Sequence, residues 1–123
     1  MISSNIDPQR GQIWLVNFHP QVGQEIGKRR PALVVNTTGI GKLPLRIVVP
    51  ITDWKDHYAN YPWFTKLQPD PGTGLSKWSG ADAFQVKSVA LERFHTQLGR
   101  ANPQQLKAVI ECLAVCIDYS YQH

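Results

Sequence analysis

The chain has 123 residues, which is enough for one domain with a hydrophobic core and gives no indication of a second. Thirteen Lys and Arg residues against nine Asp and Glu residues give a formal net charge of +4, a balance that favours an acidic partner such as a nucleic acid. With only two cysteines and no long apolar run, the composition excludes a secreted disulfide framework and a membrane-spanning helix, so we expect a soluble, cytoplasmic protein.

The first part of the chain predicts a loose tail followed by three strands. Residues 1–9 have no periodicity and contain Pro8, so we expect a disordered N-terminal tail ahead of a single domain over residues 10–121. Three runs rich in β-branched and aromatic residues are of strand length. They cover residues 12–18, 31–36 and 45–51.

The second part predicts shorter strands and one helix. Residues 53–63 are polar and aromatic and are expected to form a loop, with strands at 64–67, 81–89 and 95–98. In the second of these, Phe84 and Val86 should share one face. Asn102 and Pro103 suit an N-cap and a first helical position. Apolar side chains then recur at helical spacing at Leu106, Val109, Ile110, Leu113, Cys116 and Ile117.

Together these elements predict a mainly β (α+β) fold, a small β-barrel with a C-terminal amphipathic helix packed on it. No spacing matches a nucleophile elbow, a phosphate-binding glycine loop or a metal site, so we expect neither metal nor cofactor. Cys112 and Cys116 are four residues apart on the apolar side of the helix, where buried free cysteine is the commoner role.

A charged loop, residues 21–30, leads directly into the second predicted strand. Pro31 pushes Arg30 towards extended geometry, so the guanidinium should be held at the start of a buried strand. Arginine presents a planar fork of donors that matches a phosphate group. Thr52 follows the third predicted strand, and its hydroxyl lies close to Arg30 if the two strands are neighbours. Spacing alone equally fits a solvated arginine and a threonine that ends a strand.

Several blocks, in order and at matching spacing, resemble the MazF/PemK (Kid-like) family of toxins from toxin–antitoxin pairs. The blocks are residues 10–16, Pro20, Gly23, Glu25, residues 30–35, 50–52, 74–76 and 85–89, and the closing helix. The resemblance implies an SH3-like small β-barrel, a homodimer, and metal-independent cleavage of single-stranded RNA restrained by a cognate antitoxin. It also implies that Arg30 and Thr52 form the catalytic pair, with Glu25 as a further loop participant.

RNA carries its own nucleophile, the 2′-hydroxyl, so the residues present fit this chemistry without a metal. Cleavage is then expected to leave a 2′,3′-cyclic phosphate and a 5′-hydroxyl, with Arg30 and Thr52 stabilising the charge that develops. Some family members place an aspartate before the glutamine at position 85. Here that position is Phe84, and Asp82 is two residues away, so a mechanism that needs the carboxylate is in doubt.

Candidate RNA-binding residues surround this pair. They are Lys28, Arg29, Trp54, Lys55, Gln85 and Lys87. The aromatic residues of the 53–63 loop can stack on unpaired bases, can anchor the loop by packing, or can contact the antitoxin. The rival function is a non-catalytic toxin of the same fold that inhibits a protein target such as DNA gyrase, because fold alone does not determine function.

Overall fold

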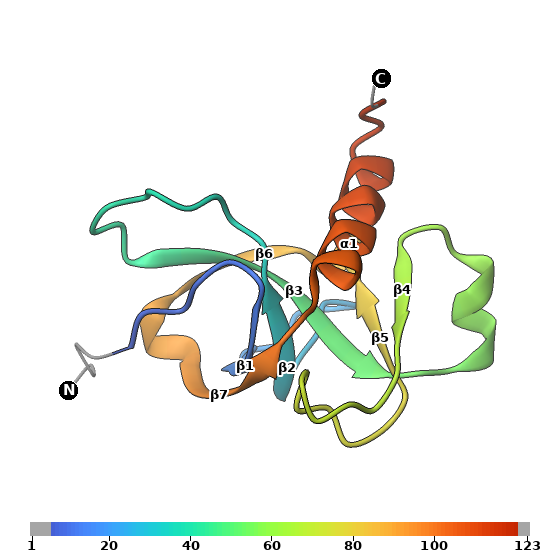
Figure 1. Cartoon of the computed structure of the whole chain (residues 1–123), viewed down its shortest axis with the longest axis horizontal. Coiled ribbons are helices and arrows are strands. Elements are labelled where there is room, and N and C mark those ends of the chain that lie inside the picture. The colour runs from blue at the N-terminus through green and yellow to red at the C-terminus, as the bar shows by residue number, and fades with distance from the viewer. Residues whose placement is uncertain (1–5, 121–123) are drawn as a thin grey trace.

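The computed structural model describes residues 6–120, and its central feature is one long strand in a bent antiparallel sheet (Figure 1). The strands are β1 (Gln12–Asn17), β2 (Arg29–Val34), β3 (Leu45–Asp53), β4 (Phe64–Leu67), β5 (Ser79–Asp82), β6 (Lys87–Ala90) and β7 (Phe94–Arg100). Three short 3₁₀ helices, η1 (Asp56–Asn60), η2 (Ala83–Gln85) and η3 (Leu91–Arg93), lie between strands, and the helix α1 (Pro103–Cys116) closes the chain.

Strand β3 joins the two parts of the sheet. The strand order is β4-β5-β3-β2-β1-β7, and β6 also pairs with β3. The first half of β3 lies between β2 and β6, with Val48 opposite both Val34 and Lys87. Its second half pairs with β5, with Thr52 opposite Gly80. The residues that follow Pro50 along β3 therefore lie where the sheet changes partners.

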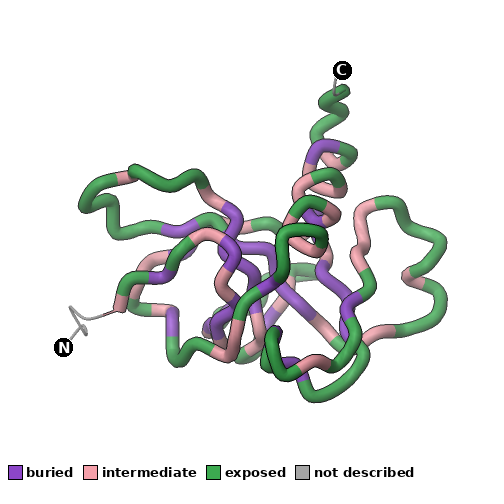
Figure 2. Tube along the Cα trace, in the orientation of Figure 1, coloured by how far each residue is buried: buried purple, intermediate pink, exposed green. Residues whose placement is uncertain are grey.

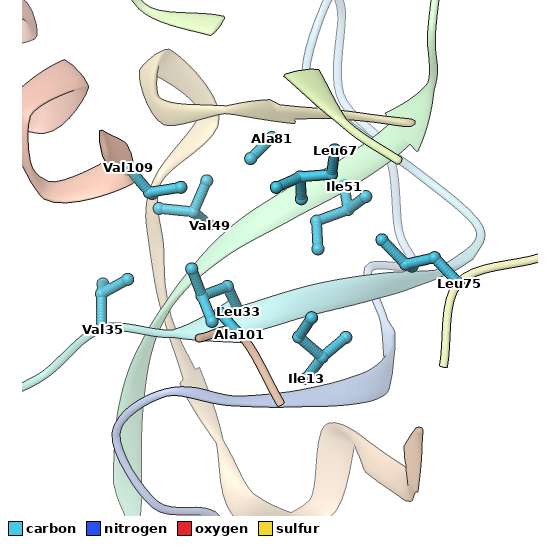
Figure 3. Close-up of a cluster of buried hydrophobic side chains, with 10 residues drawn as sticks. All are labelled: Ile13, Leu33, Val35, Val49, Ile51, Leu67, Leu75, Ala81, Ala101 and Val109. Carbon is cyan, nitrogen blue, oxygen red and sulfur yellow. The ribbon is translucent and has the colours of Figure 1, made fainter. Parts of the chain in front are cut away.

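The continuous apolar stretches of β2 and β3, residues 32–34 and 48–51, are buried on both faces, as sandwiched strands usually are. One core cluster contains Ile13, Leu33 and Val49 and lies under α1, as Figure 3 shows. A second cluster on the opposite side of the sheet contains Trp14, Val34 and other apolar side chains. Figure 2 shows buried residues concentrated in these central strands, with exposed residues in the loops and the end of α1.

The structure confirms a mainly β fold with a terminal helix. Asn102 caps α1 by accepting a hydrogen bond from the Gln105 amide, and the Gln105 side chain accepts one from the Asn102 amide. Val109 is fully buried against the first core cluster. The prediction was wrong at Ile117, which lies beyond the helix and is 76% exposed. The C-terminal end of α1 extends past the sheet (Figure 1), and Ile117 follows that end.

The expected strand over residues 81–89 is two strands separated by η2, so that prediction was wrong. The Asp82 side chain accepts a hydrogen bond from the Phe84 amide, which stabilises a turn in place of an extended chain. Phe84 is 63% exposed and does not share a strand face with Val86. The turn redirects the chain from β5, at one end of β3, to β6, at the other end.

The segment before β1 is held to the sheet by a buried arginine. Arg46 is 5% exposed, and it donates to the Pro8 carbonyl at 2.8 Å and to the Asp7 carboxylate at 2.9 Å. Pro8 is itself buried. Residues 6–9 of the expected tail are thus part of the folded domain, and residues 1–5 lie outside the described residues.

Two smaller points concern the helix. Cys112 and Cys116 are free and half-buried, and the Cys112 sulfur lies 3.3 Å from the Thr65 hydroxyl on β4. Within residues 6–120, no helix combines the length and hydropathy needed to cross a membrane.

Candidate active site

Arg30 and Thr52 meet at the end of the paired strands β2 and β3. Ala32 lies opposite Pro50, so continuing the antiparallel register by two residues brings Arg30 opposite Thr52. The Arg30 Nη1 donates to the Thr52 Oγ1 at 3.2 Å. Thr52 lies within β3, which continues to Asp53, and not after the strand as expected. Both residues are therefore held by strand pairing and not by a loop.

The Arg30 guanidinium is positioned but its charge is not neutralised. Its Nε donates to the Gly27 carbonyl at 3.2 Å, which orients the plane of the fork. In the described part of the chain, the ion pairs are Arg46 with Asp7 and Lys77 with Asp53, and neither involves Arg30. Its remaining N–H groups can bind an anion. The Thr52 hydroxyl accepts from Arg30, which leaves its own hydrogen to donate to the same anion.

The loop between β1 and β2 lies beside this pair and is held at both ends. At its base, the Phe18 amide donates to the Lys28 carbonyl at 2.8 Å. Further out, the Gln85 side chain accepts from the Ile26 amide at 3.0 Å and donates to the Gln24 carbonyl at 2.9 Å. Gln85 therefore fixes the loop that carries the Gly27 carbonyl. Sequence reasoning had no signal for this contact, because the two segments are about sixty positions apart.

Glu25 lies on the exposed part of that loop. Its amide donates to the Val22 carbonyl at 3.0 Å in a turn. Among the described residues, no hydrogen bond or ion pair joins its carboxylate to Arg30 or Thr52. The structure thus brings together two of the three predicted catalytic residues, and Glu25 is not bonded to either of them.

A cleft of about 330 Å³ opens at the same end of the sheet. It is lined by Arg29, Arg30, Pro31, Ile51, Asp53, Gly74, Leu75, Ser76, Lys77, Ser79 and Leu98. Thr52 is not part of its lining, because side chains alternate along β3 and Ile51 and Asp53 face the other way. Arg30 therefore borders both the cleft and the opposite face of β3, which carries Thr52.

The other candidate RNA-binding cations differ in their distance from the pair. Lys28 and Arg29 are exposed immediately before Arg30, and Lys28 has a positive φ of 67°. Lys55 is exposed three residues after Thr52. Lys87 is half-buried opposite Val48, four residues along β3 from Thr52. Lys28 and Arg29 thus lie beside Arg30, whereas Lys87 lies four positions along β3 from Thr52.

The aromatic side chains of residues 53–63 pack mainly against one another and against β4. The Tyr58 ring stacks on Phe64 with centroids 4.1 Å apart, and Trp54 meets Tyr58 edge-on at 5.7 Å. Tyr61 stacks on Trp63 at 5.0 Å. These contacts support the anchoring role for Tyr58, whose exposure is partial. Tyr61 is more exposed, and one of its faces is covered by Trp63.

Asp82 is the carboxylate two residues before Phe84. Burial raises its pKa above the usual value, and the hydrogen bonds from the Phe84 and Gln85 amides partly oppose that rise. Its Oδ1 is engaged in the η2 turn. Asp82 therefore has a structural role in the turn, and Phe84 projects outwards in its neighbourhood, where its ring meets Trp63 edge-on at 5.4 Å.

The bent β-sheet with one terminal helix places this protein in the class of small, barrel-like β proteins, with an arginine bonded to a threonine at the rim of the sheet. The family described as PemK-like, MazF-like toxin of type II toxin-antitoxin system matches residues 9–117. The chain belongs to this family.

Relatives of known name and structure agree with this assignment. The chain is 32% identical over 116 residues to Endoribonuclease MazF9 of Mycobacterium tuberculosis, covering 89% of this chain and 96% of that protein. It superposes on the crystal structure of MazF from Deinococcus radiodurans with a TM-score of 0.77 at 28% identity, covering 93% and 99% of the two chains. A chain of a MazE-MazF crystal structure from the same organism gives a TM-score of 0.69 at 29% identity, covering 92% of this chain and 97% of that chain. The predicted fold class is confirmed.

Proposed function

We propose that this chain is the toxin of a type II toxin–antitoxin system and cuts single-stranded RNA at selected sequences without a metal ion. One observation carries the proposal: the Arg30 fork is fixed by the Gly27 carbonyl, bonded to the Thr52 hydroxyl and not paired with a carboxylate. Family membership and the names of the relatives, Endoribonuclease MazF9 and Endoribonuclease PemK of Escherichia coli, support the same activity.

The proposed reaction uses the nucleophile of the RNA itself. The 2′-oxygen attacks the adjacent phosphorus and loses its proton, and the bond from phosphorus to the 5′-oxygen breaks as that oxygen gains a proton. The products are a 2′,3′-cyclic phosphate and a 5′-hydroxyl. Negative charge builds on the non-bridging oxygens, where Arg30 and Thr52 both donate. Donors that are already in place stabilise such charge without reorganising during the reaction.

The arginine acts in this scheme as an electrostatic group. A guanidinium keeps its proton at neutral pH, so it is a poor general base. Glu25 is the nearest carboxylate on the β1–β2 loop, and it contributes only if RNA binding brings the loop inwards. We therefore assign charge stabilisation to Arg30 and Thr52 and give Glu25 a secondary part.

The partners in this proposal are single-stranded RNA, a cognate antitoxin and a second copy of the chain, in the cytoplasm. The MazE-MazF structures of relatives support an antitoxin partner. Homodimer formation is supported by exposed apolar side chains at one end of β3, where Leu45 and Ile47 share a face and follow the exposed Leu43. Light scattering on the purified protein measures the predicted dimer directly.

The test of function is cleavage of a diverse single-stranded RNA pool in the presence of a chelator, with analysis of the new ends. We expect the wild type to leave 5′-hydroxyl ends, and Arg30→Ala to remove cleavage while its thermal unfolding remains cooperative. An intact RNA pool after incubation with the folded wild type contradicts the proposal. A DNA gyrase supercoiling assay in parallel detects the rival, in which the toxin inhibits a protein target.

A further inference from the structure

The face of the sheet that carries Thr52 continues, beyond the catalytic pair, across β5 and β4. Directly opposite residues of antiparallel strands point to the same side. Thr52 is opposite Gly80, and Gly80 is opposite Lys66. The opposite side of these strands is the core side, because Ile51, Ala81 and Leu67 belong to the first core cluster. We call the Thr52 side the outer face of β3–β5–β4.

Three side chains on this outer face form an ordered group. The Lys66 Nζ lies 4.9 Å from the centre of the Trp78 ring and 5.1 Å from the centre of the Trp54 ring. One ammonium therefore makes cation–π contacts with both indole rings. The strand pairing also continues this far, since the Trp54 amide donates to the Trp78 carbonyl at 3.0 Å. Trp54 and Trp78 are therefore neighbours at the ends of β3 and β5.

Because Gly80 has no side chain, Trp54 and Phe64 can pack directly on the strand at this position. A Cβ atom at position 80 would lie 3.0 Å from Phe64 Cδ1 and 3.1 Å from Trp54 Cε3, closer than side chains normally approach. Trp54 is thereby packed down on the sheet against Phe64, with centroids 6.4 Å apart. Trp78 is different, because 51% of it remains exposed while Lys66 lies over its ring. It is an oriented aromatic ring with surface available to a ligand.

We propose that Trp78, oriented by Lys66 beside Trp54, is a stacking subsite for an unpaired nucleobase of the RNA whose phosphate binds at Arg30 and Thr52. The inference rests on the proposed function and deepens it. Trp54 follows Thr52 by two residues, just past the end of β3 and on the same face, which is roughly 7 Å along the extended chain. The aromatic group therefore begins within about one nucleotide of the phosphate-binding pair. The nucleobase that stacks on Trp78 then belongs to a nucleotide next to the cleaved phosphate.

The group's charge favours RNA over an apolar peptide segment of a protein partner. A peptide that covered the rings with apolar side chains would bury the Lys66 ammonium without an anionic partner, which is costly. Single-stranded RNA offers a flat π-face to Trp78 and a phosphate oxygen to the ammonium in the same nucleotide.

The test measures binding separately from cleavage. A fluorescently labelled, random-sequence single-stranded RNA with 2′-O-methyl groups throughout lacks the nucleophile and stays intact, and anisotropy reports its affinity. We expect Trp78→Ala to weaken binding about 5- to 150-fold, the range for losing one base–aromatic stack. Trp78→Phe should restore most of the affinity, whereas Trp78→Leu should not, because leucine has no π-face. Thermal unfolding of each variant confirms that the fold is retained.

The contribution of the Lys66 charge to RNA binding is tested with two matched lysine variants. Lys66→Ala should weaken binding, whereas Lys107→Ala, which removes the same charge from the exposed surface of α1, should change it little. If Trp78→Ala binds the RNA as tightly as the wild type, the stacking subsite is refuted. The subsite is also refuted if this variant loses only its binding to a co-expressed antitoxin. Cleavage of unmodified RNA is scored separately, so binding through Trp78 without any cleavage would refute the proposed nuclease activity and leave the stacking subsite standing.

Discussion

The hydroxyl of Thr52 offers the sharpest test of the reaction, because it can be removed with almost no change of shape. Thr52→Val replaces the hydroxyl by a methyl group at a half-buried position of β3 and keeps the β-branched side chain. Arg30 loses one acceptor but remains bonded to the Gly27 carbonyl at 3.2 Å. The phosphate site therefore keeps its charge and loses one donor.

The expected loss follows from that single donor. Removing one preorganised donor to a developing oxyanion lowers kcat by about 100- to 1,000-fold, equivalent to about 3 to 4 kcal/mol in the barrier. The lost hydrogen bond contributes about 1 kcal/mol to stability, which the valine methyl partly offsets. Stability and catalysis are thus expected to change by clearly different amounts.

The assay is single-turnover cleavage of one RNA chosen from the sites that the wild type cuts, with enzyme in excess. Thr52→Ser is the matched control, since serine keeps the hydroxyl and should retain most of the rate. Anisotropy with the 2′-O-methyl RNA should show nearly unchanged binding for both variants. If Thr52→Val cleaves as fast as Thr52→Ser, the hydroxyl does not stabilise the transition state and the assignment of Thr52 is refuted.

Three further predictions concern the structure around the site. Gln85→Leu removes the bonds to the Ile26 amide and the Gln24 carbonyl, so amide exchange in the β1–β2 loop should become faster in the RNA-free protein, and unchanged exchange would contradict the holding role. Arg46→Met should lower the free energy of unfolding in urea by about 2 kcal/mol and leave the cleavage rate unchanged, because its bonds hold the N-terminal segment; equal stability would contradict this. Asp82→Asn keeps an oxygen acceptor for the Phe84 amide and removes a carboxylate whose pKa burial raises. Because the folded state binds that proton more tightly than the unfolded state, ionisation lowers stability as pH rises through the folded pKa. The asparagine variant should therefore melt at a higher temperature than the wild type at pH 7 and at the same temperature at pH 3.

The sequence predicted the buried strands well, and the reason is physical. Within the predicted runs, residues 32–35 and 48–51 are apolar without alternation because both faces of β2 and of the middle of β3 are covered by core clusters. Such runs can be recognised in the sequence without any knowledge of the rest of the fold. The ends were less predictable: β2 already includes Arg29, and β3 continues to Asp53, because strand pairing and not side-chain type decides where those strands end.

The region 81–89 was not predictable from periodicity. Asp82 is compatible with a strand by its position, and only its side-chain bond to the Phe84 amide turns the chain into η2. Likewise, Arg30 and Thr52 could be proposed as a pair from resemblance, but the Gln85 contact with the loop and the Lys66 contact with Trp78 join segments that are distant in sequence. Contacts of that kind depend on the register of the strands, which one sequence does not specify.

Register also connects the two halves of the proposed RNA site. Thr52, and Trp54 just past the end of β3, alternate with Ile51 and Asp53. The pairing of β3 with β2 and β5, which the bond from the Trp54 amide to the Trp78 carbonyl extends, therefore places Thr52 and Trp54 outwards and Ile51 in the core. A slip of one residue would exchange the faces and bury the threonine hydroxyl. The apolar side chains that fix this register therefore also fix the spacing between the phosphate-binding pair and the stacking subsite. It follows that the distance from the cut to the stacked base is a property of the strand and should stay the same across RNA sequences.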